Sequence, residues 1–314
     1  MTLSLGLDSS NYRSSAATVD TALSYRSTRK LLPVKMGERG LRQSDAVFAH
    51  TRQLPGLLCE LLSQINPADL VCVGVSDRPR RVEGSYMPCF LPGVGLAETV
   101  SAARNIPLYR FSHQEGHIAA ALLSAGRTDL LHECFVAFHI SGGTTEAVLV
   151  RPAAVGFETE IIGKTLDLHA GQVIDRVGVM LGLPFPSGEE LERLAENGRV
   201  TVPVRPCIKG FDCALSGVEN ICKGLFDRGE PKENIAATAL FYVSATLCAM
   251  AKKISGEYTG LPFVFSGGVM ANRNIRQEIG GILPADFASP ELSGDNAVGI
   301  ALLAMESYQC SQSN

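Results

Sequence analysis

The amino-acid sequence predicts an α/β protein in which one arrangement of strands and helices occurs twice. Short apolar runs of strand type alternate with longer segments whose apolar residues recur at helical spacing. The order strand, polar turn, strand, strand, helix, strand, helix starts near residue 3 and starts again near residue 134. The 314 residues are enough for two such halves. The evidence for duplication is this shared order of elements, since the halves show no close sequence identity.

The first half is expected to begin with three short strands and a long helix. Gly6 and the polar residues at 9–11 supply turn chemistry between the first two strands. Leu70–Val75 is apolar throughout, as is typical of a strand buried on both faces of a parallel sheet. The expected strands are Leu3–Asp8, Ser14–Val19, Ala22–Thr28, Leu70–Val75 and Ile106–Phe111, and the expected helices are Ser44–Gln64, Leu96–Arg104 and Ile118–Ser124.

The second half repeats the pattern and ends in a closing helix. Residues 235–251 carry no charge and approach membrane length, but their hydroxyl side chains and many alanines favour a buried core helix. We expect an N-terminal lobe at 1–132, completed by the closing helix within 295–314, and a C-terminal lobe at 133–294. The expected strands are Cys134–Ile140, Ala147–Val150, Thr159–Ile162 and Phe263–Phe265, and the expected helices are Ala170–Leu181, Gly188–Ala195, Asn234–Ile254 and Asn296–Ser307.

Composition excludes several classes of protein. The apolar share of 46% is ordinary for a globular chain, and the net charge of −4 excludes a broadly basic nucleic-acid surface. Nine cysteines without a C-x-x-C pair argue against a disulfide framework or a zinc ribbon. The N-terminal residues lack the pattern of a signal peptide. These features predict a cytoplasmic protein without a membrane segment.

The most informative motif is His113-Gln-Glu-Gly-His117, which opens a helix after a short apolar run. Two imidazoles four residues apart lie one turn apart on one helix face, so both can reach one transition-metal ion. A third ligand must come from elsewhere, and Asp295 is the best candidate. The alternative is a pair of polar residues at a solvated helix start.

Two Ser-Gly-Gly turns, at 141–143 and 266–268, each follow an apolar strand. Glycines at strand ends let backbone N–H groups approach phosphate oxygens. One such turn is weak evidence, but two in equivalent places of a duplicated fold favour a nucleotide loop. Asp8, at the end of the first strand, could reach a metal-bound phosphate through water, or could simply cap a turn.

Four other polar or flexible positions are candidates for nucleotide contact or for capping. Asp175 could accept ribose hydroxyls or pair on a solvated face. Gly188, after a proline-rich turn, begins a helix that could approach a ligand closely. The Asn272 amide could recognise a base or ribose, or cap the helix that it begins. Asp167 is expected to cap the helix that starts at Ala170. The sequence contains no Walker A motif, dinucleotide-binding fingerprint or nucleophile elbow.

Together these motifs resemble the tRNA threonylcarbamoyladenosine synthase family, which is TsaD-like and was formerly called the glycoproteases. The resemblance covers nearly the whole chain. It implies a duplicated ribonuclease-H-like fold of the actin-like ATPase class, with two lobes around a nucleotide and metal cleft. The motifs are His-Gln-Glu-Gly-His at 113–117, Ser-Gly-Gly-Thr-Thr-Glu at 141–146, Ala-Gly-Gln-Val-Ile-Asp-Arg at 170–176, Pro-Phe-Pro-Ser-Gly at 184–188, Leu-Ser-Gly at 215–217, Gly-Gly-Val-Met-Ala-Asn-Arg at 267–273 and Gly-Asp-Asn at 294–296.

Carried over by position, the resemblance implies a site for one divalent transition metal, Fe or Zn, on His113, His117 and Asp295. The implied reaction passes a threonylcarbamoyl group from its adenylate to N6 of adenosine 37 of tRNA, with Asp8 and Ser10 as the expected catalytic residues. The nucleotide ligand would be ATP, AMP or the adenylate. Its implied contacts are His139, Ile140, Ser141, Gly142, Gly143, Asp175, Gly188, Glu192 and Asn272.

The sequence departs from the family pattern at several positions. The family's Ser-Cys-Asp-Glu-Thr run reads Ser10-Asn11-Tyr12-Arg13-Ser14, so two acids become an aromatic and a base. Thr144, Gln172 and Glu219 also replace family residues. The alternative to an active transferase is therefore a degenerate nucleotide- and metal-binding paralogue with a regulatory or scaffolding role. A metallopeptidase is least expected, because His-Glu-x-x-His is absent. The resemblance further implies a TsaB-like dimerisation partner or self-association, and a tRNA substrate.

Overall fold

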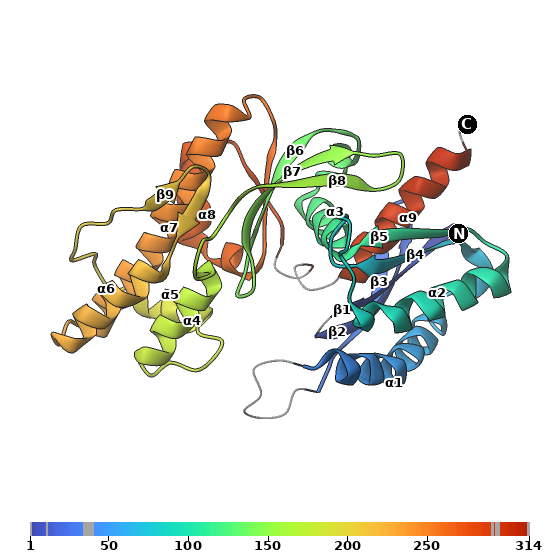
Figure 1. Cartoon of the computed structure of the whole chain (residues 1–314), viewed down its shortest axis with the longest axis horizontal. Coiled ribbons are helices and arrows are strands. Elements are labelled where there is room, and N and C mark those ends of the chain that lie inside the picture. Colours follow the sequence, from blue (N-terminus) through green and yellow to red (C-terminus); the bar gives the residue numbers. More distant parts are fainter. Residues whose placement is uncertain (1, 11, 34–40, 290–291, 293–295, 313–314) are drawn as a thin grey trace. The chain divides into compact units, whose positions relative to one another are not determined.

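The computed structural model describes residues 2–10, 12–33, 41–289, 292 and 296–312. The chain divides into two compact units, and Figure 1 shows the elements of each. Unit 1 contains Met1–Glu133, Arg151–Thr159 and Glu291–Asn314. Unit 2 contains Cys134–Val150 and Glu160–Pro290. Unit 1 is therefore assembled from three separate stretches of chain.

Unit 1 has a five-stranded sheet in the order β3-β2-β1-β4-β5. The first three strands form an antiparallel meander, whereas β4 and β5 run parallel to β1. Parallel strands require crossover connections, which the helices between them provide. The strands are β1 (Leu3–Ser10), β2 (Arg13–Asp20), β3 (Tyr25–Leu31), β4 (Leu70–Arg78) and β5 (Leu108–Ser112).

Helices cover both faces of this sheet. Leu5 and Leu7 of β1 pack in one cluster with Leu58 and Leu61 of α1. On the other face α9 lies so close that a Cβ added at Gly6 would stand 2.2 Å from the Ala297 carbonyl oxygen. Successive residues of a strand point to opposite faces, so one face carries the leucines and the other requires glycine. The helices are α1 (Gln43–Leu62), α2 (Leu91–Arg104), α3 (His113–Ala125) and α9 (Asn296–Gln312).

Unit 2 has a sheet of matching order, β12-β11-β6-β7-β8. β6 pairs antiparallel with β7 and parallel with β11, as β1 does with β2 and β4. The predicted duplication of an α/β arrangement is thus confirmed by strand order and direction. The strands are β6 (Phe135–Ile140), β7 (Thr145–Pro152), β8 (Phe157–Lys164), β11 (Phe263–Ser266) and β12 (Asp286–Phe287), with a separate small sheet of β9 (Cys207–Lys209) and β10 (Asp212–Ala214).

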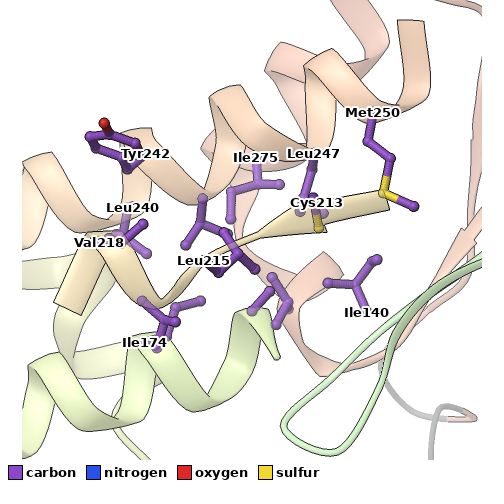
Figure 2. Close-up of a cluster of buried hydrophobic side chains, with 14 of the residues drawn as sticks. Ile140, Ile174, Cys213, Leu215, Val218, Leu240, Tyr242, Leu247, Met250 and Ile275 are labelled. Atoms are coloured by element: carbon purple, nitrogen blue, oxygen red, sulfur yellow. The ribbon is translucent and has the colours of Figure 1, made fainter. Parts of the chain in front are cut away.

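The core of unit 2 surrounds the long helix α7. Figure 2 shows side chains from α4, α6, α7, α8 and the β10 region gathered in one cluster. α7 is long and apolar enough to cross a membrane, yet 67% of its most apolar window is buried inside the protein. It therefore serves as the core helix that the sequence predicts. The helices are α4 (Ala170–Met180), α5 (Gly188–Ala195), α6 (Ser216–Asp227), α7 (Lys232–Glu257) and α8 (Arg273–Ile282).

Several expected elements have other bounds in the structure, among them the third strand, α2 and α3. The third strand starts at Tyr25 instead of Ala22, because the Asp20 carboxylate accepts the N–H groups of Ala22 and Ser24 and holds 20–24 as a turn. α2 starts at Leu91, five residues early, since Gly93 and Gly95 lie inside the helix and not in a loop. α3 starts at His113, so both imidazoles belong to its first turns.

Candidate functional site

The two histidines of the motif occupy the first two turns of α3. Ser112 caps the helix, and its side chain and that of Glu115 form a capping box. The rings of His113 and His117 stand edge to face with centroids 4.5 Å apart. The helix start thus brings two half-buried imidazoles together, as the spacing predicts.

Asp8, at the end of β1, bonds to the first of these histidines. Its Oδ1 accepts from His113 Nδ1 at 2.9 Å and from the Ser76 hydroxyl, while Oδ2 accepts from the Ser10 N–H at 3.3 Å. Burial alone would raise the pKa of Asp8, but the His113 charge and these hydrogen bonds hold the pKa well below its usual range. Because a carboxylate only accepts, His113 keeps its proton on Nδ1 when the imidazole is neutral, and in that form Nε2 is the ligand atom.

Helix α9 contributes Asn296 to the same place. Asn296 Nδ2 donates to the His113 carbonyl oxygen at 2.8 Å and also lies against His113 Nδ1. Asn296 Oδ1 is buried and has no hydrogen-bond partner among the described residues. An unsatisfied buried acceptor of this kind indicates a site for a further donor or ligand.

A close helix crossing puts Asn296 within reach. A Cβ added at Gly299 of α9 would stand 1.9 Å from the carbonyl oxygen of Gly116 in α3. Gly116, which lies between Glu115 and His117, is therefore part of the close contact between α3 and α9. Glycine at both positions allows the two backbones to touch.

The third proposed metal ligand, Asp295, lies outside the described residues. Within the described part of the chain no group of three histidine, cysteine, aspartate or glutamate side chains could hold a metal ion. The described residues nevertheless provide part of a metal site. Two imidazoles lie side by side, and the Asp8 carboxylate orients the ring of His113.

A pocket of about 360 Å³ opens beside the histidines in unit 1. Its lining combines polar and apolar side chains, and includes the expected catalytic residues Asp8 and Ser10 together with two of the altered positions, Tyr12 and Arg13. The full lining is Asp8, Ser10, Tyr12, Arg13, Ser15, Leu31, Pro79, Met87, Phe90, His113, His117 and Asn296.

The two Ser-Gly-Gly turns both belong to unit 2. They follow β6 and β11, which are neighbouring parallel strands, with Ser266 in register with His139. The expectation that they occupy equivalent places of the duplicated fold is therefore wrong, because β6 corresponds to β1 whereas β11 corresponds to β4. His139 Nδ1 lies 3.2 Å from the Ser266 hydroxyl, so the two turns lie side by side at one sheet edge.

The first turn, at 141–143, rests on the start of α4. The Gly171 N–H donates to the Ser141 carbonyl oxygen at 3.2 Å, and the Ser141 hydroxyl accepts from the Gly143 and Thr144 N–H groups. Ile140, which precedes the turn, is fully buried and anchors it. Gly142 and Gly143 are exposed, with open space where a Cβ would stand. The turn is thus both fixed and accessible.

The remaining candidates make local hydrogen bonds. Asp175 Oδ1 accepts from the Ser187 N–H at 2.8 Å and holds the proline-rich turn that precedes Gly188. Asn272 caps α8 through the Ile275 N–H, and Glu192 Oε1 accepts from the Arg273 N–H. Asn272 therefore acts as a helix cap in this structure, which is one of the two roles that the sequence leaves open.

Asp167 caps a different helix from the one expected. Its carboxylate accepts from the N–H groups of Leu215 and Ser216 and from the Ser216 hydroxyl, at the start of α6. The helix that starts at Ala170 is capped by His169, whose N–H donates to Gln172 at 3.1 Å.

Two polar residues near the site are buried, and the sequence does not predict their burial. Glu115 is fully buried; its carboxylate accepts from the Ser112 and Phe157 N–H groups and lies 3.6 Å from Arg81. His50 of α1 is equally buried, beneath β2, and its Nδ1 lies 2.8 Å from the Ser14 hydroxyl. The sequence carries no signal for His50, because a single histidine in a helix has no periodic partner.

The buried His50 is expected to make stability depend on pH. Burial lowers the pKa of His50, and the Ser10 backbone and the Asp8 charge oppose this only in part. The unfolded chain therefore binds a proton below the ordinary pKa of about 6.5 while the folded protein resists it, so stability falls as the pH drops from 7 to 5. In urea unfolding at pH 7, 6 and 5, His50→Gln should flatten this slope by at most about 1.4 kcal/mol per pH unit.

The wild-type chain in the same buffers is the reference for this slope. An equal slope in wild type and His50→Gln would contradict the assignment of a neutral buried imidazole.

Comparison with known proteins identifies the family of this chain. The family model for TsaD, tRNA N6-adenosine threonylcarbamoyltransferase, matches residues 36–302. Relatives with that same name include one from Halalkalibacterium halodurans, 30% identical over 96% of this chain and 90% of its own. Another, from Thermus thermophilus, is 31% identical over 83% of this chain and 78% of its own.

Solved structures show the fold at much lower identity. HypF from T. kodakarensis superposes with a TM-score of 0.62 at 13% identity, covering 98% of this chain and 48% of its own. A ROK family glucokinase from Streptomyces griseus gives a TM-score of 0.54 at 11% identity, covering 97% and 99%. The fold is thus the duplicated actin-like ATPase fold that the resemblance implies. Because the family model matches most of this chain, the chain belongs to the tRNA N6-adenosine threonylcarbamoyltransferase family and is a transferase.

Proposed function

We propose that this protein transfers a threonylcarbamoyl group from threonylcarbamoyl-adenylate to N6 of adenosine 37 of tRNA, with one Fe or Zn ion held by His113, His117 and Asp295. The observation that carries the proposal is the imidazole pair 4.5 Å apart, with Asp8 bonded to His113 Nδ1. A carboxylate that fixes the tautomer of a histidine in this way is typical of metal ligands.

Each described residue has a role in this proposal. Asp8 orients His113 and leaves its Nε2 available. The metal, when bound, supplies Lewis-acid polarisation of a substrate oxygen. Ser10, whose N–H is bonded to Asp8, faces the pocket and provides a hydroxyl beside the reacting group.

The nucleotide is proposed to bind in unit 2 at the edge formed by β6 and β11. The supporting observation is that the paired turns present exposed Gly142 and Gly143 backbone at the start of α4, where an anion is favoured. Gly188, which begins α5, and Asn272, which caps α8, are further proposed contacts. The others are His139, Ile140, Ser141, Asp175 and Glu192.

A TsaB-like partner or a second copy is proposed to share the binding of tRNA. The net charge of −4 supports this, since a chain without a broadly basic surface gains little from phosphate contacts alone. We propose that the reaction takes place in the cytoplasm.

His117→Ala tests the proposal through both metal and product. Losing one imidazole of the pair should reduce the metal that copurifies with the chain by tenfold or more. Mutation of a residue that only orients a metal ligand already lowers metal affinity by about 10–100-fold. Metal content is measured by mass spectrometry of the purified protein. The modified nucleoside is measured in tRNA from cells in which this chain is the sole family member.

His132→Ala is the matched control, because His132 is 65% exposed and pairs with Glu306. Unmodified tRNA in cells that carry the wild-type chain and its partner would sink the transferase proposal, whatever the metal content.

A degenerate regulatory paralogue is the second candidate, favoured by Tyr12 and Arg13 in the pocket lining. Two other altered residues have structural partners instead: Gln172 bonds the His169 N–H, and Glu219 pairs with Arg176 at 3.0 Å. Turnover of threonylcarbamoyl-adenylate and tRNA by the purified chain with its partner would exclude this candidate.

A further inference from the structure

We propose that the pocket beside the histidines contains a carboxylate subsite, with Arg13 as the counter-ion for a small N-acylated amino acid. The subsite would hold the acid end of the group that is transferred, so the inference rests on the proposed function and names a specificity residue for it. The change from an acid to Arg13 then alters which substrates the pocket accepts.

Strand register places Arg13 in the pocket. β1 and β2 are joined across residues 11–12, with Ser10 opposite Arg13 and Asp8 opposite Ser15. Residues directly opposed in a sheet point to the same face. Leu31 of β3 lies opposite Arg13 in turn. The alternation of side chains along each strand therefore brings five residues to one face of the sheet, and all five line the pocket: Asp8, Ser10, Arg13, Ser15 and Leu31.

The charges in the lining favour an anion. Asp8 is the only carboxylate in the described lining, and its oxygens already accept from His113, Ser76 and Ser10. Arg13 is also held by an interaction within the protein. A guanidinium has five N–H donors, and its planar fork matches a carboxylate in two parallel hydrogen bonds.

Within the described lining, the same balance favours an occupant without an ammonium group. An ammonium group would need an acceptor carboxylate, and Asp8, the carboxylate of that lining, already accepts from His113 and Ser76. A nitrogen that is acylated or carbamoylated is neutral and needs none. The subsite thus fits an amino-acid derivative whose nitrogen carries an acyl or carbamoyl group.

The rest of the lining suits a short side chain. Tyr12, Leu31, Met87 and Phe90 form an apolar wall, and the hydroxyl-bearing Ser10 and Ser15 lie on the sheet face. The volume of about 360 Å³ is at the lower end of ligand pockets, which span roughly 300–1,000 Å³. This is room for a small acid.

The test measures binding of N-carbamoyl-L-threonine and of its carboxamide to the full, metal-free chain by calorimetry. Arg13→Gln should weaken binding of the carboxylate by about tenfold to a hundredfold, the usual value of a charge-assisted hydrogen bond. Binding of the carboxamide should be weak in wild type and unchanged by Arg13→Gln. Arg13→Lys should fall between wild type and Arg13→Gln for the carboxylate, because a lysine keeps the charge and loses the fork. L-Threonine should bind more weakly than its carbamoyl derivative.

Arg26→Gln is the matched control, since Arg26 is exposed on the adjacent strand and lines a different pocket. If Arg13→Gln weakens both probes equally, or if neither probe binds saturably to wild type, the subsite is overturned. Transfer to tRNA is assayed separately: loss of transfer with intact Arg13-dependent binding refutes only the proposed function, whereas transfer with Arg13-independent binding refutes only the subsite.

Discussion

Gly299→Ala is expected to lower the free energy of unfolding by about 3 kcal/mol or more, at or above the upper end of the usual cost of overpacking. The new methyl carbon would stand 1.9 Å from the Gly116 carbonyl oxygen and 2.7 Å from the Ala120 N, both backbone atoms of α3. Backbone cannot rotate away as a side chain can, so α9 and α3 must separate along their whole contact. The separation would also draw Asn296 away from His113.

Urea unfolding followed by circular dichroism measures the effect. Gly56→Ala is the matched control, because Gly56 lies inside α1 with open space where its Cβ would stand. That variant should gain about 0.5–1 kcal/mol from helix propensity. Equal stability of wild type and Gly299→Ala would show that the helix crossing tolerates a side chain, contrary to the close packing described.

Glu115→Ala is expected to cost about 3–5 kcal/mol, the usual result of removing one partner from a buried charge network. The carboxylate accepts from the Ser112 N–H at 2.7 Å, the Ser112 hydroxyl at 2.8 Å and the Phe157 N–H at 2.9 Å. Alanine leaves these donors unsatisfied, and Arg81 loses its counter-ion. Metal bound by the neighbouring histidines should decrease as well, because the cap that starts α3 is lost.

Glu98→Ala is the comparison for a surface acid. Glu98 is 54% exposed and pairs with Arg110, so its loss should cost at most about 1 kcal/mol. If the two variants had equal unfolding midpoints, Glu115 would have no special part in holding residues 112 and 157 together.

The duplicated fold could be predicted from sequence because apolar periodicity and turn residues report it locally. Gly188–Ala195 has the predicted bounds, and Ala170–Met180 differs at one end by one residue. α6 escaped prediction, because its cap is Asp167, some fifty residues earlier. Residues 91–95 of α2 escaped as well, because Gly93 and Gly95 usually indicate a loop.

For the site, sequence identified the side chains that share a motif but not those that meet through the fold. His113 and His117 adjoin because helical spacing dictates it. Ser76, Asn296 and Arg13 reach the same place only through strand register and a helix crossing between distant segments. The Ser-Gly-Gly turns show the converse error, because a repeated motif suggests equivalent places of the duplicated fold, whereas the two occurrences follow neighbouring, non-equivalent strands of one sheet.

The discontinuous composition of unit 1 has a consequence for synthesis on the ribosome. Unit 2 is complete once residue 290 has emerged, but unit 1 still lacks α9, whose residues 296–312 end the described chain. Until then the sheet face around Gly6 and Gly74 has no cover, although its strands were made first. Domains usually fold from the N-terminus onward. Here the N-terminal sheet must await α9, so the nascent chain exposes that face until residues 296–312 have been made.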